Sequence, residues 1–170
     1  KENSFDYLII LYACLLGGYV ACPIDPTLKK EKIIELKKLY KIDYTIESID
    51  KIDYKNCKAD SNLVKYENTD CLIIGSSGTT GDPKGILFSS DSILSSAQSF
   101  SQLAKYNDKT KILHCLPMFY MGGILDTFFA CMYSGSTIIL GKRFSINNVL
   151  NFWELPIKHK CNTLFLTPSI

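Results

Sequence analysis

Apolar and polar positions follow a pattern that changes repeatedly from helical to strand-like spacing along the chain. Residues 5–16 are almost entirely apolar and predict a helix, and "YVACPI" at 19–24 predicts a strand. The stretch 27–41 places apolar residues at helical spacing with lysines opposite them, which indicates an amphipathic surface helix. "IDYTI" at 42–46 predicts a second strand. The chain therefore opens with helix, strand, helix and strand.

The alternation resumes after residues 47–70, a polar and charged stretch that we interpret as a surface excursion. Two short apolar runs, "CLIIG" and "GILF", predict strands on either side of a glycine-rich segment. Ser89, Ser90 and Asp91 are N-cap candidates for a helix over about 91–105. The pattern then predicts strands at 111–116, 136–140 and 163–166 and helices at 122–135 and 146–159, with Pro156 breaking the end of the last helix. Such alternation predicts an α/β fold with a largely parallel sheet and helices on both faces.

Composition is that of an ordinary globular protein and argues against several functions. The 170 residues, 46% hydrophobic and 21% charged, suffice for one domain that buries roughly 70% of its unfolded surface. A net charge of +2, scattered lysines and a single arginine, Arg143, predict no nucleic-acid partner. The uncharged run 7–24 is broken by two glycines and ends in a turn signal, so we predict no targeting segment and no transmembrane segment.

The cysteines and histidines predict no metal site. Seven cysteines form no Cys-x-x-Cys pair, and most lie in apolar runs, where a free thiol behaves as a small hydrophobe. His114 and His159 lie far apart in the sequence. The odd number of cysteines and their apolar contexts favour a reducing environment, so we predict a cytoplasmic protein.

The segment 75–85, "GSSGTTGDPKG", concentrates glycines, hydroxyl groups and one lysine. Glycine allows a ligand to approach the backbone, successive N–H groups form an anion-binding concavity, and Lys84 adds a charge suited to phosphate. It is not a Walker A loop, because Pro83 precedes the lysine and Gly85 follows it. It also runs into a strand, which predicts a hairpin. From the residues alone, a phosphate clamp and a flexible Ser/Gly turn both stay open.

"SSGTTGDPKG" closely resembles the phosphate-binding signature of the adenylate-forming (AMP-binding) enzymes, which include acyl-CoA synthetases, luciferases and peptide-synthetase adenylation domains. "YACLLGGYVACPIDP", "LPMFYMGG", "SGSTIIL" and "TLFLTPSI" resemble further landmarks of that family in the same order. The resemblance covers nearly the whole chain apart from the excursion. It implies that residues 1–170 are part of the large N-terminal domain of an acyl-CoA-synthetase-like enzyme, without its C-terminal domain.

The resemblance implies ATP-dependent activation of a small carboxylic acid. The carboxylate attacks the α-phosphorus of ATP, pyrophosphate leaves, and the acyl group passes to coenzyme A or to a phosphopantetheine carrier. Mg²⁺ is expected to help neutralise the phosphates. The matching residues around the β- and γ-phosphates would be Ser76, Ser77, Gly78, Thr79, Thr80, Gly81 and Lys84.

The family's adenine-binding segment, its Mg²⁺-binding glutamate, its ribose-binding aspartate and its C-terminal lysine cannot be located in the sequence, and we assign no catalytic residue. We therefore predict that the chain needs the rest of the N-terminal domain and the C-terminal domain as partners, and that it catalyses no adenylation alone.

The resemblance also implies an acyl-substrate pocket at Tyr120, Gly122 and Gly123. Tyr120 stands where many acyl-CoA synthetases carry histidine and where amino-acid-activating members usually carry aspartate. A tyrosine is uncharged at neutral pH, which favours a fatty, aryl or other uncharged-tail acid and a place in fatty acid metabolism. Simple packing of Tyr120 at a helix start is the alternative. Ser90 likewise replaces a frequent histidine, and a capping role would account for it.

Several further side chains receive structural interpretations. We interpret Asp126 as a buried, hydrogen-bonded aspartate or one at a helix edge. The aromatic residues expected in the core are Phe128, Phe129, Tyr133 and Trp153. Two alternatives to the acyl-CoA ligase stay open: a peptide-synthetase-type adenylation domain that loads a carrier protein, and a non-catalytic nucleotide-binding module derived by truncation.

Overall fold

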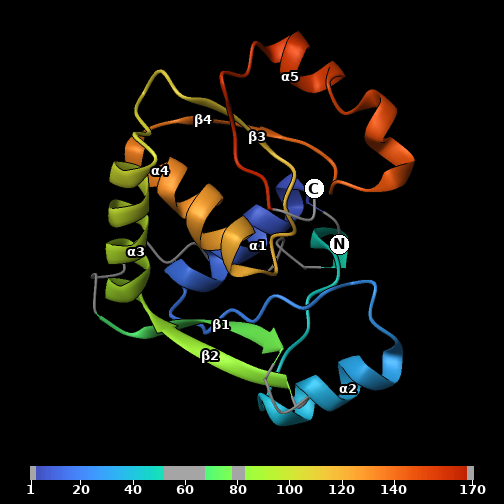
Figure 1. Ribbon diagram of the computed structural model, residues 1–170. Coiled ribbons are helices and arrows are strands. Elements are labelled where there is room, and N and C mark those ends of the chain that lie inside the picture. Colours follow the sequence, from blue (N-terminus) through green and yellow to red (C-terminus); the bar gives the residue numbers. More distant parts are fainter. Residues whose placement is uncertain (1–2, 52–67, 78–82, 168–170) are drawn as a thin grey trace. The chain divides into compact units, whose positions relative to one another are not determined.

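The computed structural model describes residues 3–51, 68–77 and 83–167. The chain forms two compact units, residues 3–90 and residues 91–170 (Figure 1). Most of the surface excursion and the centre of the glycine-rich loop lie outside the described residues, so the predictions for those segments stay predictions.

Two helices open the first unit. α1, Phe5–Leu16, begins after Ser4, whose hydroxyl oxygen accepts the Tyr7 amide at 3.2 Å and so satisfies one donor of the first turn. α2, Lys30–Leu39, buries Leu36 and leaves Lys30 and Lys38 exposed. Both helices confirm the predictions from the hydrophobic pattern, although α2 is shorter than the predicted 27–41.

The glycine-rich segment connects two antiparallel strands, as predicted. β1, Asp70–Ser77, pairs with β2, Pro83–Ser89, and together they form a two-stranded sheet. Both strands consist largely of apolar residues up to the point where the glycines and serines begin. The hairpin therefore brings the two ends of the loop close together.

Two predicted strands do not form in the described part of this unit. Residues 19–24 contribute one parallel bridge, in which Ala21 makes two backbone hydrogen bonds to β1, of 2.9 and 2.8 Å. Pro23 has no N–H group with which to continue that ladder. Residues 42–46 pair with no described strand, and Tyr44 is 83% exposed. Their alternating pattern is real, but no neighbouring strand in the described part of the chain buries it.

The second unit confirms the predicted parallel sheet. β3, Lys111–His114, lies between β4, Thr137–Leu140, and β5, Thr163–Leu164, and both pairs are parallel. Helix α3, Ser90–Leu103, precedes β3, and further helical segments follow β3 and β4 (Figure 1). The fold is α/β, and the carboxyl ends of the three strands lie at one edge of the sheet.

The helix after β3 departs from α-helical geometry. Gly122–Phe129 is a π-helical segment, η2, which continues as α4, Ala130–Ser134. Gly135 ends α4 in the left-handed conformation with φ of 70°, which glycine adopts without steric cost. The predicted helix over 122–135 is confirmed, and its wide first turns are a feature that the hydrophobic pattern does not reveal.

The helix predicted over 146–159 is divided into two short pieces. Ile146–Asn151 is a 3₁₀ helix, η3, and Glu154–His159 is α5. Pro156 is the third residue of α5, where its missing N–H would have no partner inside the helix. The prediction that Pro156 breaks the end of a long helix is therefore wrong, because this proline lies in the first turn of a new one.

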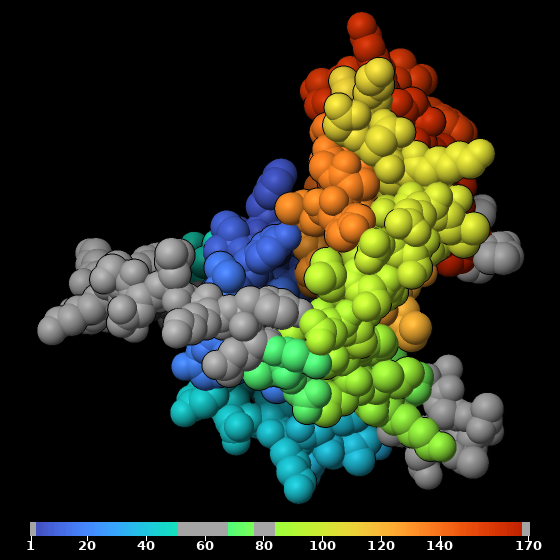
Figure 2. Space-filling model, turned by 90° about the vertical axis from the view of Figure 1, so that its left-hand side faces the viewer, coloured from blue at the N-terminus to red at the C-terminus, as the bar shows by residue number. Residues whose placement is uncertain are grey.

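The core of the second unit gathers on β3, η2 and α4. Its deeply buried side chains include those of Ile112, Leu113, His114, Ile124, Leu125, Phe128 and Cys131. α3 buries Ile93, Ala97 and Ser101, and its opposite side lies on the surface in Figure 2. Phe128 is in the core as expected and Phe129 is half-buried, but Tyr133 and Trp153 are 47% and 55% exposed. The core assignment of those two residues is wrong.

The described cysteines are all free thiols: Cys14, Cys22, Cys71, Cys115, Cys131 and Cys161. Among the described residues, no group of three or more His, Cys, Asp or Glu side chains is arranged to hold a metal ion. No helix in the described ranges has the length and apolar character needed to cross a membrane.

Candidate functional site

The register of the hairpin places Ser76 directly opposite Lys84 at the base of the glycine-rich loop. Paired residues of an antiparallel ladder point to the same face, so the hydroxyl and the ammonium group share one side of the hairpin. The Ser76 hydroxyl donates to the Lys84 carbonyl oxygen at 3.3 Å, and the Lys84 side chain is exposed. An exposed cation beside a hydroxyl is suited to bind phosphate oxygens.

The structure brings together only part of the predicted phosphate clamp. Ser76 and Lys84 are adjacent, and Ser77 is the last residue of β1. Gly78, Thr79, Thr80 and Gly81 lie outside the described residues, so their role stays a prediction. Ser90 is the first residue of α3, and its hydroxyl oxygen accepts the Thr69 amide at 3.3 Å, which ties the end of β2 to the start of β1.

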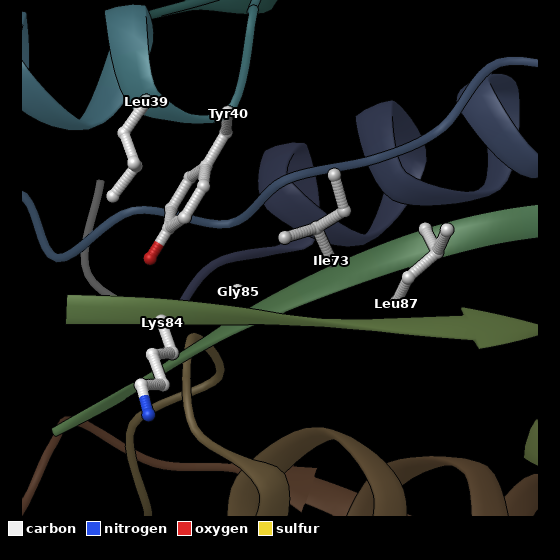
Figure 3. A pocket seen from close by; sticks show the side chains of 6 residues that line it. All are labelled: Leu39, Tyr40, Ile73, Lys84, Gly85 and Leu87. Carbon is white, nitrogen blue, oxygen red and sulfur yellow. The ribbon is translucent and has the colours of Figure 1, made fainter. Parts of the chain in front are cut away.

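The opposite face of the hairpin carries the glycine pair Gly75 and Gly85 and meets the ring of Tyr40, the residue that follows α2 (Figure 3). A Cβ atom added to Gly75 would lie 3.3 Å from the Tyr40 Oη. A Cβ atom added to Gly85 would lie 2.8 Å from the Tyr40 Cε1. Neither glycine has a positive φ that would exclude larger residues, so lack of space favours glycine here: Tyr40 crowds both positions, and the Ile73 Cγ2, 3.0 Å from a Cβ on Gly85, adds to the crowding there.

A shallow pocket of about 440 Å³ opens beside this ring, lined by Leu39, Tyr40, Ile73, Lys84, Gly85 and Leu87. Figure 3 shows the Lys84 ammonium pointing away from Tyr40. The Tyr40 hydroxyl is buried and has no hydrogen-bond partner among the described residues. Burial raises the pKa of Tyr40, the nearby Cys22 thiol raises it further, and Lys32 acts in the opposite direction.

Tyr40 was not predicted from the sequence, because its apolar ring fits the hydrophobic face of α2. The signal that could have found it is the register of the hairpin. Two glycines that face each other across a β-ladder leave a gap that another group must fill.

Tyr120 lies just before η2, at the carboxyl edge of the parallel sheet. Its carbonyl oxygen accepts the amides of Gly123 and Ile124, at 3.1 and 2.9 Å. The residue is 53% exposed, and its ring packs on Phe119 with the ring centroids 5.0 Å apart. The guanidinium carbon of Arg143 lies 5.5 Å from the centre of the Phe119 ring, which is a cation–π contact. Tyr120 thus packs at a helix start and also presents much of its ring to solvent.

Gly122 and Gly123 have different environments. A Cβ atom on Gly123 would overlap the carbonyl oxygen of Pro117. A Cβ atom on Gly122 would lie 3.7 Å from both Leu116 and Phe165, which follow the ends of β3 and β5. Gly122 is therefore the point where two strand ends and η2 meet, a position where open α/β sheets commonly bind ligands.

Asp126 is half-buried in η2, and its Oδ2 would lie 3.9 Å from a Cβ atom on Gly122. Burial raises the pKa of this carboxyl group. The half-buried position of Asp126 agrees with an aspartate at a helix edge and not with a fully buried one. Burial also raises the pKa of the neighbouring Tyr106 to about 12, with smaller contributions from Cys131 and Asp126.

Comparison with known proteins decides the family. The model of the AMP-binding enzyme family matches residues 1–170. The chain belongs to this family. The resemblance seen in the sequence motifs is thereby confirmed.

Curated relatives are similar over parts of their length. A probable CoA ligase from Humulus lupulus is 31% identical over 111 residues, which are 63% of this chain and 18% of the relative. Gramicidin S synthase 2 from Brevibacillus brevis is 25% identical over 185 residues, which cover 99% of this chain and 4% of the relative. The chain therefore spans less than a fifth of the length of these relatives.

Solved structures share the fold. The inhibitor-bound N-terminal domain of FACL13 from Mycobacterium tuberculosis superposes with a TM-score of 0.78 at 21% identity, over 99% of this chain and 48% of that domain. ATP-bound MatB from Rhodopseudomonas palustris gives a TM-score of 0.76 at 16% identity, over 96% of this chain and 37% of MatB. The chain has the fold of about half of an AMP-binding N-terminal domain.

Proposed function

We propose that this chain supplies the phosphate-binding part of an AMP-forming acid–thiol ligase. The ligase would join a carboxylate to the α-phosphate of ATP, release pyrophosphate and pass the acyl group to coenzyme A. The observation that carries the proposal is the hairpin register, which sets Ser76 and Lys84 side by side at the base of the signature loop. Positive charge and hydroxyl donors at that place stabilise pyrophosphate as it leaves.

The full phosphate cradle in this proposal consists of Ser76, Ser77, Gly78, Thr79, Thr80, Gly81 and Lys84. The described residues fit ATP, because they offer a lysine and a hydroxyl on one face. They hold no cluster of carboxylates for a resident metal ion. We therefore propose that Mg²⁺ binds through the phosphate oxygens of the nucleotide and shares the charge neutralisation with Lys84.

The acyl group would bind at the carboxyl edge of the parallel sheet, near Tyr120, Gly122 and Gly123. The exposed, uncharged Tyr120 ring favours an acid with an uncharged tail, such as a fatty or aryl acid. The similarity to a probable CoA ligase supports coenzyme A as the acceptor. We propose that the remaining parts of the N-terminal domain and a C-terminal domain complete the site, so that these 170 residues alone are inactive. The free thiols favour a cytoplasmic setting.

Acid-dependent ATP–pyrophosphate exchange tests the proposal. The protein with its native flanking sequence is assayed with fatty, aryl and amino acids, together with Lys84→Ala and, as a matched control, Lys38→Ala on the exposed side of α2. We expect exchange with one class of acid, a loss of about 100-fold or more in Lys84→Ala, and no change in Lys38→Ala. Full exchange in Lys84→Ala would contradict the proposal, and so would a folded, ATP-binding protein that exchanges with no acid.

A second candidate is an adenylation domain of the peptide-synthetase type. The similarity to gramicidin S synthase 2, which extends over nearly the whole chain, favours it. Tyr120 argues against it, because a tyrosine offers no negative charge to an α-amino group. Exchange with amino acids only, and acyl transfer to a phosphopantetheine carrier, would select this candidate. A folded protein that binds ATP without exchange would instead indicate a non-catalytic binding module.

A further inference from the structure

We propose that Tyr40 is a positioning residue for the phosphate-binding hairpin. Its side chain fills the gap over the glycine pair and fixes the separation and twist of the two strands. The glycine pair is next in the ladder to the pair formed by Ser76 and Lys84. This role deepens the proposed function and rests on it, since it assumes that Ser76 and Lys84 meet the phosphates.

The contacts join Tyr40 to both strands at once. The distances of 3.3 and 2.8 Å to added Cβ atoms show that the hydroxyl end of the side chain lies over Gly75 and the ring edge over Gly85. Ser76 and Lys84 are the next positions along the ladder towards the loop, on the opposite face. A shift of the ring would therefore move the two strand positions that carry the hydroxyl and the ammonium group.

A glycine pair is a weak point in a two-stranded ladder. Glycine has the largest conformational freedom to lose, and it contributes no cross-strand side-chain contact. An aromatic ring laid over such glycines restores both the packing and the restraint. Because the pair lies at the root of the loop, the ring acts where looseness would most disturb the geometry of the phosphate site.

The ring carries most of this effect and the hydroxyl less. The ring edge lies over Gly85, whereas the hydroxyl reaches Gly75, is buried and makes no hydrogen bond with any described residue. Removal of the hydroxyl gives up one van der Waals contact and should cost little, whereas loss of the planar ring should loosen the hairpin. The two effects are separable by substitution with phenylalanine and leucine.

The proposal also divides the glycines of the signature. Tyr40 lies over Gly75 and Gly85, on the face opposite the side chains of Ser76 and Lys84. In the proposed function, Gly78 and Gly81 are the glycines of the loop at which the nucleotide would come close to the backbone. Substitutions in the two pairs should therefore respond differently to a change at Tyr40.

Mg-ATP affinity tests the proposal directly. Titrations compare the wild-type protein in its native flanking sequence with Tyr40→Leu, Tyr40→Phe and the matched control Tyr44→Leu, a tyrosine on the solvent side. We expect the dissociation constant of Mg-ATP to rise about tenfold in Tyr40→Leu, to change much less in Tyr40→Phe and to stay unchanged in Tyr44→Leu. The KM of the acid should not change. Unchanged Mg-ATP affinity in folded Tyr40→Leu would overturn the proposal.

A double-substitution cycle keeps the proposal testable if Tyr40→Leu fails to fold. Among the described residues beyond its chain neighbours, the Tyr40 Oη is the only atom within 4 Å of a Cβ on Gly75. Gly75→Ala should weaken Mg-ATP binding and lower the melting temperature, and Tyr40→Phe should rescue both when it is combined with Gly75→Ala. Additive effects in this pair would overturn the proposal.

The two proposals fail in different ways. If Lys84→Ala abolishes exchange while the Tyr40 variants bind Mg-ATP normally, the ligase function stands and the positioning role falls. If the wild-type protein binds no Mg-ATP, the ligase function and the positioning role both fall. In that case the melting temperatures of the Gly75→Ala and Tyr40→Phe variants show only whether Tyr40 stabilises the hairpin.

Discussion

Gly123 marks a close approach of two backbone segments in the second unit. A side chain there would run into the carbonyl oxygen of Pro117, and no rotamer change can remove a main-chain atom. Gly122 is adjacent in the same π-helical segment but has ordinary contact distances around it. The two glycines therefore form a natural pair for comparing a blocked position with an open one.

We predict that Gly123→Ala destabilises the protein by about 3 kcal/mol, because the added methyl group forces the segments apart. Gly122→Ala should be neutral or stabilising by about 0.5 kcal/mol, since alanine loses less backbone entropy in a helix. Both variants gain the same helix propensity, so their difference isolates the contact with Pro117. Urea unfolding measures it, and equal stabilities would contradict the prediction.

At the residue scale, the sequence reveals functional groups when their residue types are concentrated in one short segment. Ser76 and Lys84 could be proposed from the sequence because hydroxyl groups, glycines and one positive charge in a single loop are typical of phosphate binding. Tyr40 could not, because its importance arises from the register of strands more than 30 residues further along the chain. Trp153 was misassigned because large aromatic size favours burial without ensuring it.

Secondary-structure elements can be predicted from the sequence where the contacts that stabilise them are local. α1, α2 and α3 were predictable since a helix makes its hydrogen bonds within itself. Residues 42–46 were not, because a strand needs a partner, and the described chain offers none at that place. The parallel pairing of β3 with β4 and β5 followed from the alternation of strands and helices, whereas the order of the three strands is known only from the structure.

The π-helical turns of η2 rest on a contact that no periodicity shows. The buried Thr127 hydroxyl donates to the carbonyl oxygen of Gly122 at 2.5 Å and lies 3.1 Å from that of Gly123. In a π-helix the backbone hydrogen bonds join residues five apart, and the hydroxyl adds a further donor to the carbonyls of the first turn. Thr127 therefore belongs to the helix as a bonding partner as well as a core side chain.

We predict that Thr127→Val lowers the free energy of unfolding by about 1 kcal/mol, because it preserves shape but removes the hydrogen bond of a buried hydroxyl. Thr137→Val, at an exposed position of β4, is the control and should be neutral. Chemical unfolding of both variants provides the measurement. A Thr127→Val protein as stable as the wild type would show that the backbone alone satisfies these turns.

At the scale of the whole molecule, the pH dependence of stability should report the burial of His114. This side chain is fully buried in β3, and neither ring nitrogen has a hydrogen-bond partner among the described residues. Burial lowers the pKa of His114 from 6.5 to about 4, an effect that the backbone of Leu116 partly opposes. As the pH falls, the His114 imidazole of the unfolded chain therefore binds a proton at a higher pH than that of the folded chain does.

The contribution of neutral His114 to the free energy of unfolding is fully present above pH 6.5 and is lost as the pH falls towards 4. We predict that the wild-type protein loses about 2 kcal/mol more stability between about pH 7 and pH 5 than His114→Leu does. His159→Gln, at an exposed position, is the control and should behave as the wild type. Parallel pH curves for the wild type and His114→Leu would contradict the prediction.

The contact of one ring with two glycines also constrains how this chain can evolve. Positions 40, 75 and 85 share a single small volume, so the residue at each decides which mutations the remaining two accept. A larger residue at 75 fits more easily once the hydroxyl at 40 is lost, and the reverse order passes through a weakened intermediate. Mutational paths through the phosphate loop therefore begin outside the signature, at the end of a helix that contains none of its residues.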